Sequence, residues 1–294
     1  MNANGLYNGL DAGAAMGVYN GTNGGVGNGA ISNETKPSNI PILDRFPGAA
    51  AAYSLRKLRS GYAGAAIRVR RSSDNAEQDI LFGNNGTINE NQLISFIGGN
   101  SGFVSVWYDQ SLNGLNASRT VQLEQPRIVL SGVVDKSNFK IGIVGDTVDY
   151  LETPSNFTFT SAFTVGKVNG FDTVSYIVGS ATVGLFYGGS GGGINGIGAF
   201  DGTNSRQLTG EDLNQHLAWY SMRGGRIYIA RDGQVEQDTN TFAASLSINR
   251  LFGRGVSGGT HFNGVIQELI FYNSDQTVSR PYIEQNINQY YKIY

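Results

Sequence analysis

The 294-residue chain contains no cysteine, and proline occurs only six times. Without cysteine there are no disulfides, no thiolate metal ligands and no cysteine nucleophile. The scarcity of proline excludes a proline-rich linker protein, and no segment approaches the roughly 18 apolar residues of a membrane span. The first residues lack the basic and apolar regions of a secretory signal. We therefore expect a protein that is made in a cytoplasm and does not bind a membrane.

Charged residues are also scarce, at 15% of the chain, and the formal net charge is -2. This balance argues against binding nucleic acid or anionic membranes by bulk electrostatics. No cofactor or metal site is expected, because the two histidines lie 45 positions apart and no phosphate-binding loop is present. Residues 201–204 contain oxygen ligands suited to calcium, but we interpret them as an ordinary turn.

Glycine, in contrast, is about twice as frequent as usual, and it is concentrated in residues 1–42. Glycine at this density cannot order a segment by itself. The same segment nevertheless contains regularly spaced apolar residues, which are Leu6, Tyr7, Leu10, Val18 and Tyr19. We interpret residues 1–42 as an assembly arm that becomes ordered on a partner subunit. A disordered leader is the alternative.

Residues 43–294 are expected to form one domain. Pro47, an alanine run and an apolar stripe predict a helix over residues 47–60, and similar stripes predict helices over 90–97 and 279–291. The expected strands occupy residues 65–71, 103–108, 127–130, 139–144, 157–168, 175–178, 183–187, 217–222, 226–231, 247–252 and 264–272. Asp232-Gly233 predicts a tight hairpin turn. Many short strands separated by glycine and asparagine turns are typical of an all-β sandwich.

Arginine is clustered in residues 43–125, which we expect to form a helix–strand elaboration packed on this sandwich. The cations lie close in sequence to carboxylates, and the guanidinium fork suits bidentate pairing with them. The proposed members of a structural ion-pair network are Arg68, Arg70, Arg71, Asp74, Asp79 and Asp109. We interpret the cluster as structural, because buried ion pairs are more often structural than catalytic.

Two runs in this segment, AYSLRKLRSGYAGAAIRVRRSSDNAEQDI and VWYDQSLNGLNA, resemble the opening of the catalytic domain of α-L-arabinofuranosidase B. The same opening, with its motifs VRRSSD and WYDQS, recurs in lectin-like proteins of phages and other viruses. The final third, with FNGVIQELIFYN before a terminal helix, resembles the laminin-G and concanavalin-like lectins. These resemblances imply a mainly β, jelly-roll sandwich with a few short helices.

The first of these resemblances raises the question of whether the chain is an enzyme. Glycoside hydrolysis needs two carboxyl groups about 5 to 10 Å apart, one of them kept protonated by its surroundings. The resemblance implies an adjacent cysteine pair and a catalytic glutamate after an Asn-x-His-Met run. The chain has no cysteine, and neither His216 nor His261 lies in such a run. Glu268 is interpreted as a solvent-facing strand residue. We therefore expect no enzyme, with an arabinofuranosidase-type hydrolase as the less favoured alternative.

Sugar binding would need an exposed aromatic platform, for which the candidates are Trp107, Tyr108, Tyr187 and Trp219. Core packing is the favoured interpretation of both tryptophans, so a glycan-binding module for host attachment stays an open alternative. The glycine-rich arm and the viral resemblance together predict a virion structural protein, either a capsid decoration or a fibre subunit. It would be made in the host cytoplasm and bind other capsid proteins as a homo-oligomer, for which we expect a trimer.

Overall fold

The computed structural model describes residues 40–170, 174–190, 194–210, 212–235, 237–239, 241–255 and 261–294. The chain divides into two units, Met1–Lys36 and Pro37–Tyr294. The first unit lies outside the described residues. The expected assembly arm therefore remains a prediction, including its anchors Leu6, Tyr7, Leu10, Val18 and Tyr19.

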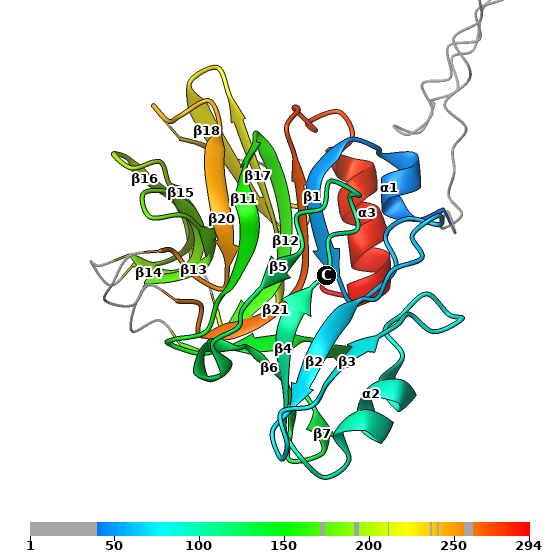
Figure 1. Cartoon of the computed structure of the whole chain (residues 1–294). Coiled ribbons are helices and arrows are strands. Elements are labelled where there is room, and N and C mark those ends of the chain that lie inside the picture. The colour runs from blue at the N-terminus through cyan, green and yellow to red at the C-terminus, as the bar shows by residue number, and fades with distance from the viewer. Residues whose placement is uncertain are drawn as a thin grey trace, which may run out of the picture. The chain divides into compact units, whose positions relative to one another are not determined.

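Antiparallel strands dominate the second unit, and they form two layers (Figure 1). One layer consists of β1 (Ala49–Ser54), β10 (Ile143–Gly145), β21 (Gly264–Tyr272), β12 (Ser161–Val168), β17 (His216–Arg223), β18 (Arg226–Arg231) and β19 (Gln237–Thr239). The other consists of β3 (Glu77–Ile80), β2 (Ile67–Arg71), β4 (Gly102–Trp107), β5 (Ala117–Ser118), β11 (Leu151–Phe159), β20 (Leu246–Leu251), β13 (Val174–Gly179), β14 (Gly184–Ser190), β15 (Ile194–Phe200) and β16 (Ser205–Thr209). The predicted mainly β sandwich is confirmed.

The two layers are joined at one edge by β6 (Arg127–Leu130), which pairs with both β4 and β10. The short strand β7 (Val133–Val134) extends β6, and a separate hairpin is formed by β8 (Lys136–Ser137) and β9 (Lys140–Ile141). A short 3-10 helix, η1 (Gln122–Glu124), precedes β6. This edge places the β10–β11 turn next to residues of the arginine-rich segment.

A hydrophobic core fills the space between the layers. Phe157 and Phe159 of β11 pack on Phe271 of β21, with ring centroids 5.3 and 5.0 Å apart. A second core covers the outer face of β21, β12 and β17, where α1 (Ile42–Arg45) and α3 (Arg280–Tyr291) pack against the sheet. Figure 1 shows both helices beside β1. None of the helices in the described part of the chain is long and apolar enough to cross a membrane.

The predicted helix over residues 47–60 is wrong, because Ala49–Ser54 forms strand β1 and pairs with β21. Five of its six residues are buried, and Ala51 and Ala52 belong to the two different cores. An alternation of this kind suits a strand between two apolar layers, and tertiary pairing of this extent overrides the helical propensity of alanine. The helices predicted over 90–97 and 279–291 are confirmed as α2 (Glu90–Ile97) and α3.

Two predicted strands are divided in the structure. The segment 157–168 contains the end of β11 and all of β12, and the chain passes from one layer to the other at Thr160. The segment 139–144 is likewise shared between β9 and β10. The turn predicted at Asp232-Gly233 is confirmed, since both residues have positive φ, at 53° and 70°.

The contact between β12 and β21 makes a testable prediction about Gly264. A Cβ at this position would lie 2.2 Å from the backbone oxygen of Lys167, which cannot move without separating the strands. Gly264→Ala is therefore expected to destabilise the protein by about 1–3 kcal/mol. Gly99→Ala is the matched control, because nothing lies within 4 Å of its added methyl. Equal unfolding midpoints in urea for the two variants would contradict this prediction.

Candidate active site

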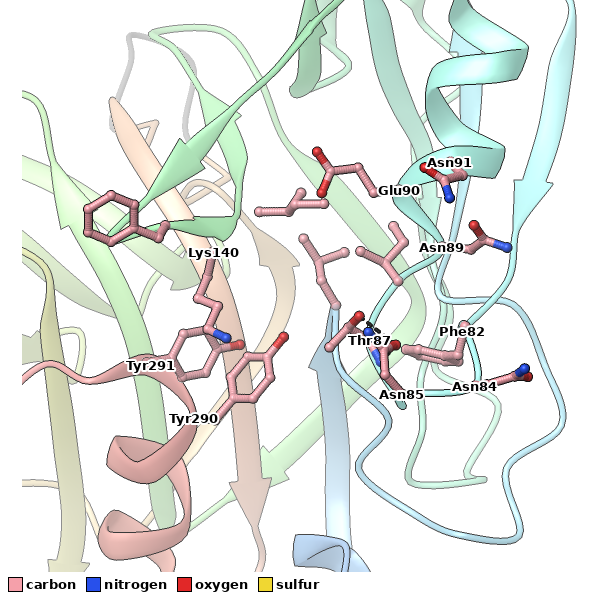
Figure 2. Close-up of a pocket in the computed structure, with 15 residues that line it drawn as sticks. Phe82, Asn84, Asn85, Thr87, Asn89, Glu90, Asn91, Lys140, Tyr290 and Tyr291 are labelled. Atoms are coloured by element: carbon pink, nitrogen blue, oxygen red, sulfur yellow. Dashed lines mark hydrogen bonds between the residues drawn. The ribbon is translucent and has the colours of Figure 1, made fainter.

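Three of the cavities in the described part of the second unit have volumes of about 680, 500 and 470 Å³. The largest has a single carboxylate, Glu90, and Lys136 Nζ lies 2.7 Å from one of its oxygens. Figure 2 shows this cavity between Tyr290 on one wall and Asn89 on the other. The cavity of about 500 Å³ contains two carboxyl groups that are not paired with arginine, and it is the candidate active site.

The two carboxyl groups of the candidate site belong to Asp146 and Asp149, in the turn that joins β10 to β11. The backbone N–H of Asp146 donates to Asp149 Oδ2 at 3.1 Å, and the N–H of Val148 donates to Asp146 Oδ1 at 2.8 Å. These two bonds close the turn and hold both carboxyl groups against the same cavity. Asp149 is buried, whereas Asp146 is exposed.

The two aspartates have different electrostatic environments. Burial, and then the negative charge of Asp146, raise the pKa of Asp149 to about 7. A side-chain hydrogen bond with Asp146 acts in the same direction. Near neutral pH the site therefore contains a buried carboxyl group that can donate a proton, beside a second carboxyl group that faces solvent.

The candidate site is also lined by Arg70, which was predicted to join the ion-pair network. Its guanidinium instead donates to Gln125 Oε1 at 2.7 Å, Asn75 Oδ1 at 2.9 Å and the Gln122 carbonyl at 3.1 Å. It also lies over the ring of Phe103, 4.9 Å from the centroid. The prediction of a carboxylate partner for Arg70 is wrong, because amide and carbonyl oxygens of the surrounding loops occupy its donors. The result is a fixed cation and polar groups that line the same cavity as the two aspartates.

The neighbouring cation Arg127 compensates Asp149 only in part, because its charge lowers the pKa of Asp149 but its hydrogen bonds go elsewhere. Its Nε and Nη2 donate to the two oxygens of Asp135 at 2.8 and 3.1 Å. This bidentate pair holds the guanidinium beside the cavity but directs its hydrogen bonds to another carboxylate. Asp149 therefore remains desolvated without a bound counter-charge, which explains why burial is the main cause of its raised pKa.

Other carboxylates that could have carried the chemistry are engaged elsewhere. Glu268 was predicted to face solvent, but it is fully buried and forms a bidentate pair with Arg56 at 2.7 and 2.8 Å. In the cavity of about 470 Å³, His216 lies between Asp232 Oδ2 at 2.6 Å and Asp212 Oδ1 at 3.0 Å. Asp201 accepts N–H bonds that close its own turn, as expected for an ordinary turn. Each of these groups is already bound by partners within the protein.

The rest of the arginine cluster forms separate local contacts. Arg68 pairs with Asp79 at 2.7 and 3.0 Å, and Arg71 pairs with Asp74 at 2.6 Å. Asp109 belongs to no arginine pair in the described residues. It accepts backbone N–H bonds from Ala52 at 2.9 Å, Ser111 at 2.8 Å and Leu115 at 3.2 Å. The prediction that Asp109 joins the ion-pair network is therefore wrong, since its carboxylate instead fixes the turn after β4 against β1.

The aromatic candidates for sugar binding are not exposed as a platform. Trp107, Tyr187 and Trp219 are fully buried. Trp107 packs on Tyr53 and Trp219 belongs to the core under α3. Tyr108 is partly buried, and its hydroxyl donates to Asp79 at 2.7 Å. The alternation that placed the other three rings on strands directs them inward, and the hydroxyl of Tyr108 is bound to Asp79, so the four do not form an exposed platform.

An antiparallel sandwich with a buried carboxyl group of raised pKa beside an exposed carboxyl group in one cavity is suited to acid–base chemistry on a glycosidic bond. Residues 37–216, more than half of the chain, match the model of the family α-L-arabinofuranosidase B, catalytic. The chain belongs to this family. The resemblance in the opening motifs is thereby confirmed. No curated protein matches the sequence.

Solved structures of the same kind have a similar fold. A GH54 α-L-arabinofuranosidase mutant soaked with 4-nitrophenyl α-L-arabinofuranoside superposes with a TM-score of 0.65. The same enzyme type soaked with a cyclic sulfate inhibitor gives 0.63, and an arabinofuranosidase complexed with arabinofuranosyl-α-1,2-xylobiose gives 0.61. In each case the identity is 14%, and the match covers 84% of this chain and 64% of the other. The chain thus spans less than two thirds of the length of these proteins.

The family match corrects two expectations. The chain was expected to be a virion structural protein and not an enzyme, whereas its family is that of a glycosidase catalytic domain. The absence of cysteine was given too much weight, because carboxyl groups and not thiols perform glycoside hydrolysis. The expected trimer and capsid partners were derived from the overturned interpretation.

Proposed function

We propose that the chain is a glycoside hydrolase that removes α-L-arabinofuranosyl groups, with Asp149 as the general acid. The observation that carries this proposal is the cavity in which Asp149 has a pKa of about 7 beside exposed Asp146. The family match supplies the substrate class. Asp149 donates its proton to the leaving-group oxygen while the glycosidic bond breaks.

Asp146 is the second carboxylate of the proposed reaction. Its exposure leaves it accessible to a sugar or to water. In a retaining reaction it would attack the anomeric carbon, and in an inverting reaction it would activate a water molecule. Proton NMR of the first-formed arabinose distinguishes the two, because the anomer is either the same as in the substrate or the opposite one.

Hydrolysis of 4-nitrophenyl α-L-arabinofuranoside is the primary test of the proposal. The full chain is expected to release nitrophenol. Its rate on arabinoxylan, whose leaving group needs a proton, should fall as the pH rises through about 7, because Asp149 then loses the proton that it donates. Asp146→Asn should lose most of the activity, whereas Asp44→Asn, at an exposed position outside this cavity, should retain it. Absence of turnover on this substrate and on arabinoxylan would refute the proposal.

A further inference from the structure

A carbohydrate subsite outside the candidate active site is indicated by the largest cavity, of about 680 Å³. Figure 2 shows its two walls, with Lys140, Tyr290 and Tyr291 on one side and the loop of Asn84, Asn85 and Asn89 on the other. The cavity is lined mainly by amide, hydroxyl and aromatic groups. It contains none of the residues of the candidate active site, so the acid chemistry assigned there does not explain it.

The rim of this cavity contains an aromatic side chain in an unusual position. Phe139 is 94% exposed, and it occupies the two-residue turn between β8 and β9. Both turn residues have positive φ, 46° for Asn138 and 61° for Phe139. This type of turn favours asparagine followed by glycine, and a bulky residue with positive φ is strained. A strained and solvent-exposed phenylalanine stabilises nothing in the fold, which points to a role in binding.

The turn is nevertheless held firmly in place. The side-chain amide of Asn138 donates to the backbone oxygens of Tyr291 and Lys292 at 2.7 and 2.8 Å. The Phe139 ring is therefore presented from a fixed backbone, which lowers the entropic cost of binding. Tyr290 cannot provide the same surface, because Lys140 Nζ lies 4.2 Å from its ring centroid and Tyr291 packs on it at 4.7 Å.

The facing wall provides hydrogen-bonding groups without a free charge. Asn84 and Asn91 are exposed, and neither amide makes a hydrogen bond to another residue of the described part of the chain. Amides both donate and accept, as the hydroxyl groups of a sugar do. The carboxylate of Glu90 is neutralised by Lys136 at 2.7 Å. The asparagine wall thus favours a hydroxyl-rich ligand, while the cation of the other wall, Lys140, lies over the ring of Tyr290.

We propose that this cavity binds a neutral polysaccharide chain, with one sugar ring stacked on Phe139 and its hydroxyl groups bonded to the asparagine wall. This proposal rests on the proposed function, since arabinofuranosyl groups would reach the active site attached to such a polymer. The subsite would hold the polymer away from the scissile bond, and small aryl glycosides would not use it.

Phe139→Gly is the decisive variant, because binding and stability should change in opposite directions. Loss of the ring is expected to weaken binding to soluble arabinoxylan by about 10- to 100-fold in isothermal titration. Glycine relieves the positive φ, so the melting temperature should rise by about 2–4 °C. Phe139→Tyr keeps the ring and should bind as the unmodified chain does. Val278→Ala is the control for loss of an exposed apolar side chain outside the cavity.

The possible outcomes separate this proposal from the proposed function. Weakened arabinoxylan binding with unchanged hydrolysis of 4-nitrophenyl α-L-arabinofuranoside supports the subsite. Binding that depends on Phe139 in a chain without any hydrolysis would support the subsite and refute the hydrolase. Unchanged affinity in Phe139→Gly would overturn the subsite. A preference for polygalacturonate that is abolished by salt would also overturn it. So would sedimentation that shows an oligomeric chain becoming a monomer in Phe139→Gly, because this face would then be a contact between copies of the chain.

Discussion

Replacement of Asp149 by asparagine is expected to lower the hydrolysis of arabinoxylan by about 10²–10⁴-fold. The amide keeps the size of the carboxyl group but cannot protonate the leaving oxygen. 4-Nitrophenol leaves readily without a proton, so the loss on the aryl glycoside should be much smaller. The measurement is kcat/KM on both substrates. A uniform loss on both would assign Asp149 to substrate binding and not to acid catalysis.

The same variant is expected to be more stable than the unmodified chain above neutral pH. Asp149 has a pKa of about 7 in the folded protein and about 3.9 in an unfolded chain. Between these values the folded state binds the additional proton, so stability falls as the pH rises from about 4 to 7. Asparagine cannot ionise and avoids this loss, which we expect to be on the order of 2–4 kcal/mol at pH 8.

Urea unfolding at pH 4 and pH 8 measures this effect. The difference in free energy of unfolding between variant and unmodified chain should be near zero at pH 4 and should favour the variant at pH 8. Asp146→Asn is an informative control, because it removes the charge that contributes to the raised pKa of Asp149. A stability gain that does not depend on pH would show that Asp149 is not held protonated in the folded state.

The elements that the sequence predicts well are those with a local cause. The α2 helix begins where the Asn89 side chain accepts the N–H of Gln92 at 3.0 Å, and it ends at Gly98, whose φ is 59°. Both signals are visible in the sequence as an asparagine before an apolar stripe and a glycine pair after it. Strand β1 has no such signal, because its conformation depends on pairing with β21, about 220 residues later.

The candidate site was missed for a related reason. Asp146 and Asp149 lie in a short run, GDTVDY, that is typical of an ordinary turn. The surroundings that raise the pKa of Asp149 are brought by residues such as Phe103 and Gln122, which are distant in sequence. Two carboxylates three positions apart between predicted strands were the available signal. Burial distinguishes such a pair from a solvated turn, and burial depends on the fold.

Glu268→Gln is expected to lower the free energy of unfolding more than the other substitutions proposed above, because it breaks a fully buried ion pair. Glu268 accepts two bonds from Arg56, one from Ser54 Oγ at 2.8 Å and one from the hydroxyl of Tyr291 at 3.3 Å. Arg56 also donates to Asn286 of α3 at 2.9 Å. The pair thus ties β1, β21 and α3 together.

Glutamine would leave the Arg56 guanidinium without its counter-charge in the protein interior, at a cost of about 3–5 kcal/mol. The double variant Arg56→Met with Glu268→Leu should cost less than Glu268→Gln alone, since no unpaired charge remains. Asp79→Asn is the matched control within the same segment, because Arg68 and Asp79 are each 41% exposed and such a pair contributes about 0–1 kcal/mol. Urea unfolding of the three variants measures these differences. If Glu268→Gln loses no more free energy of unfolding than Asp79→Asn, the buried pair does not hold the second core to the sheet.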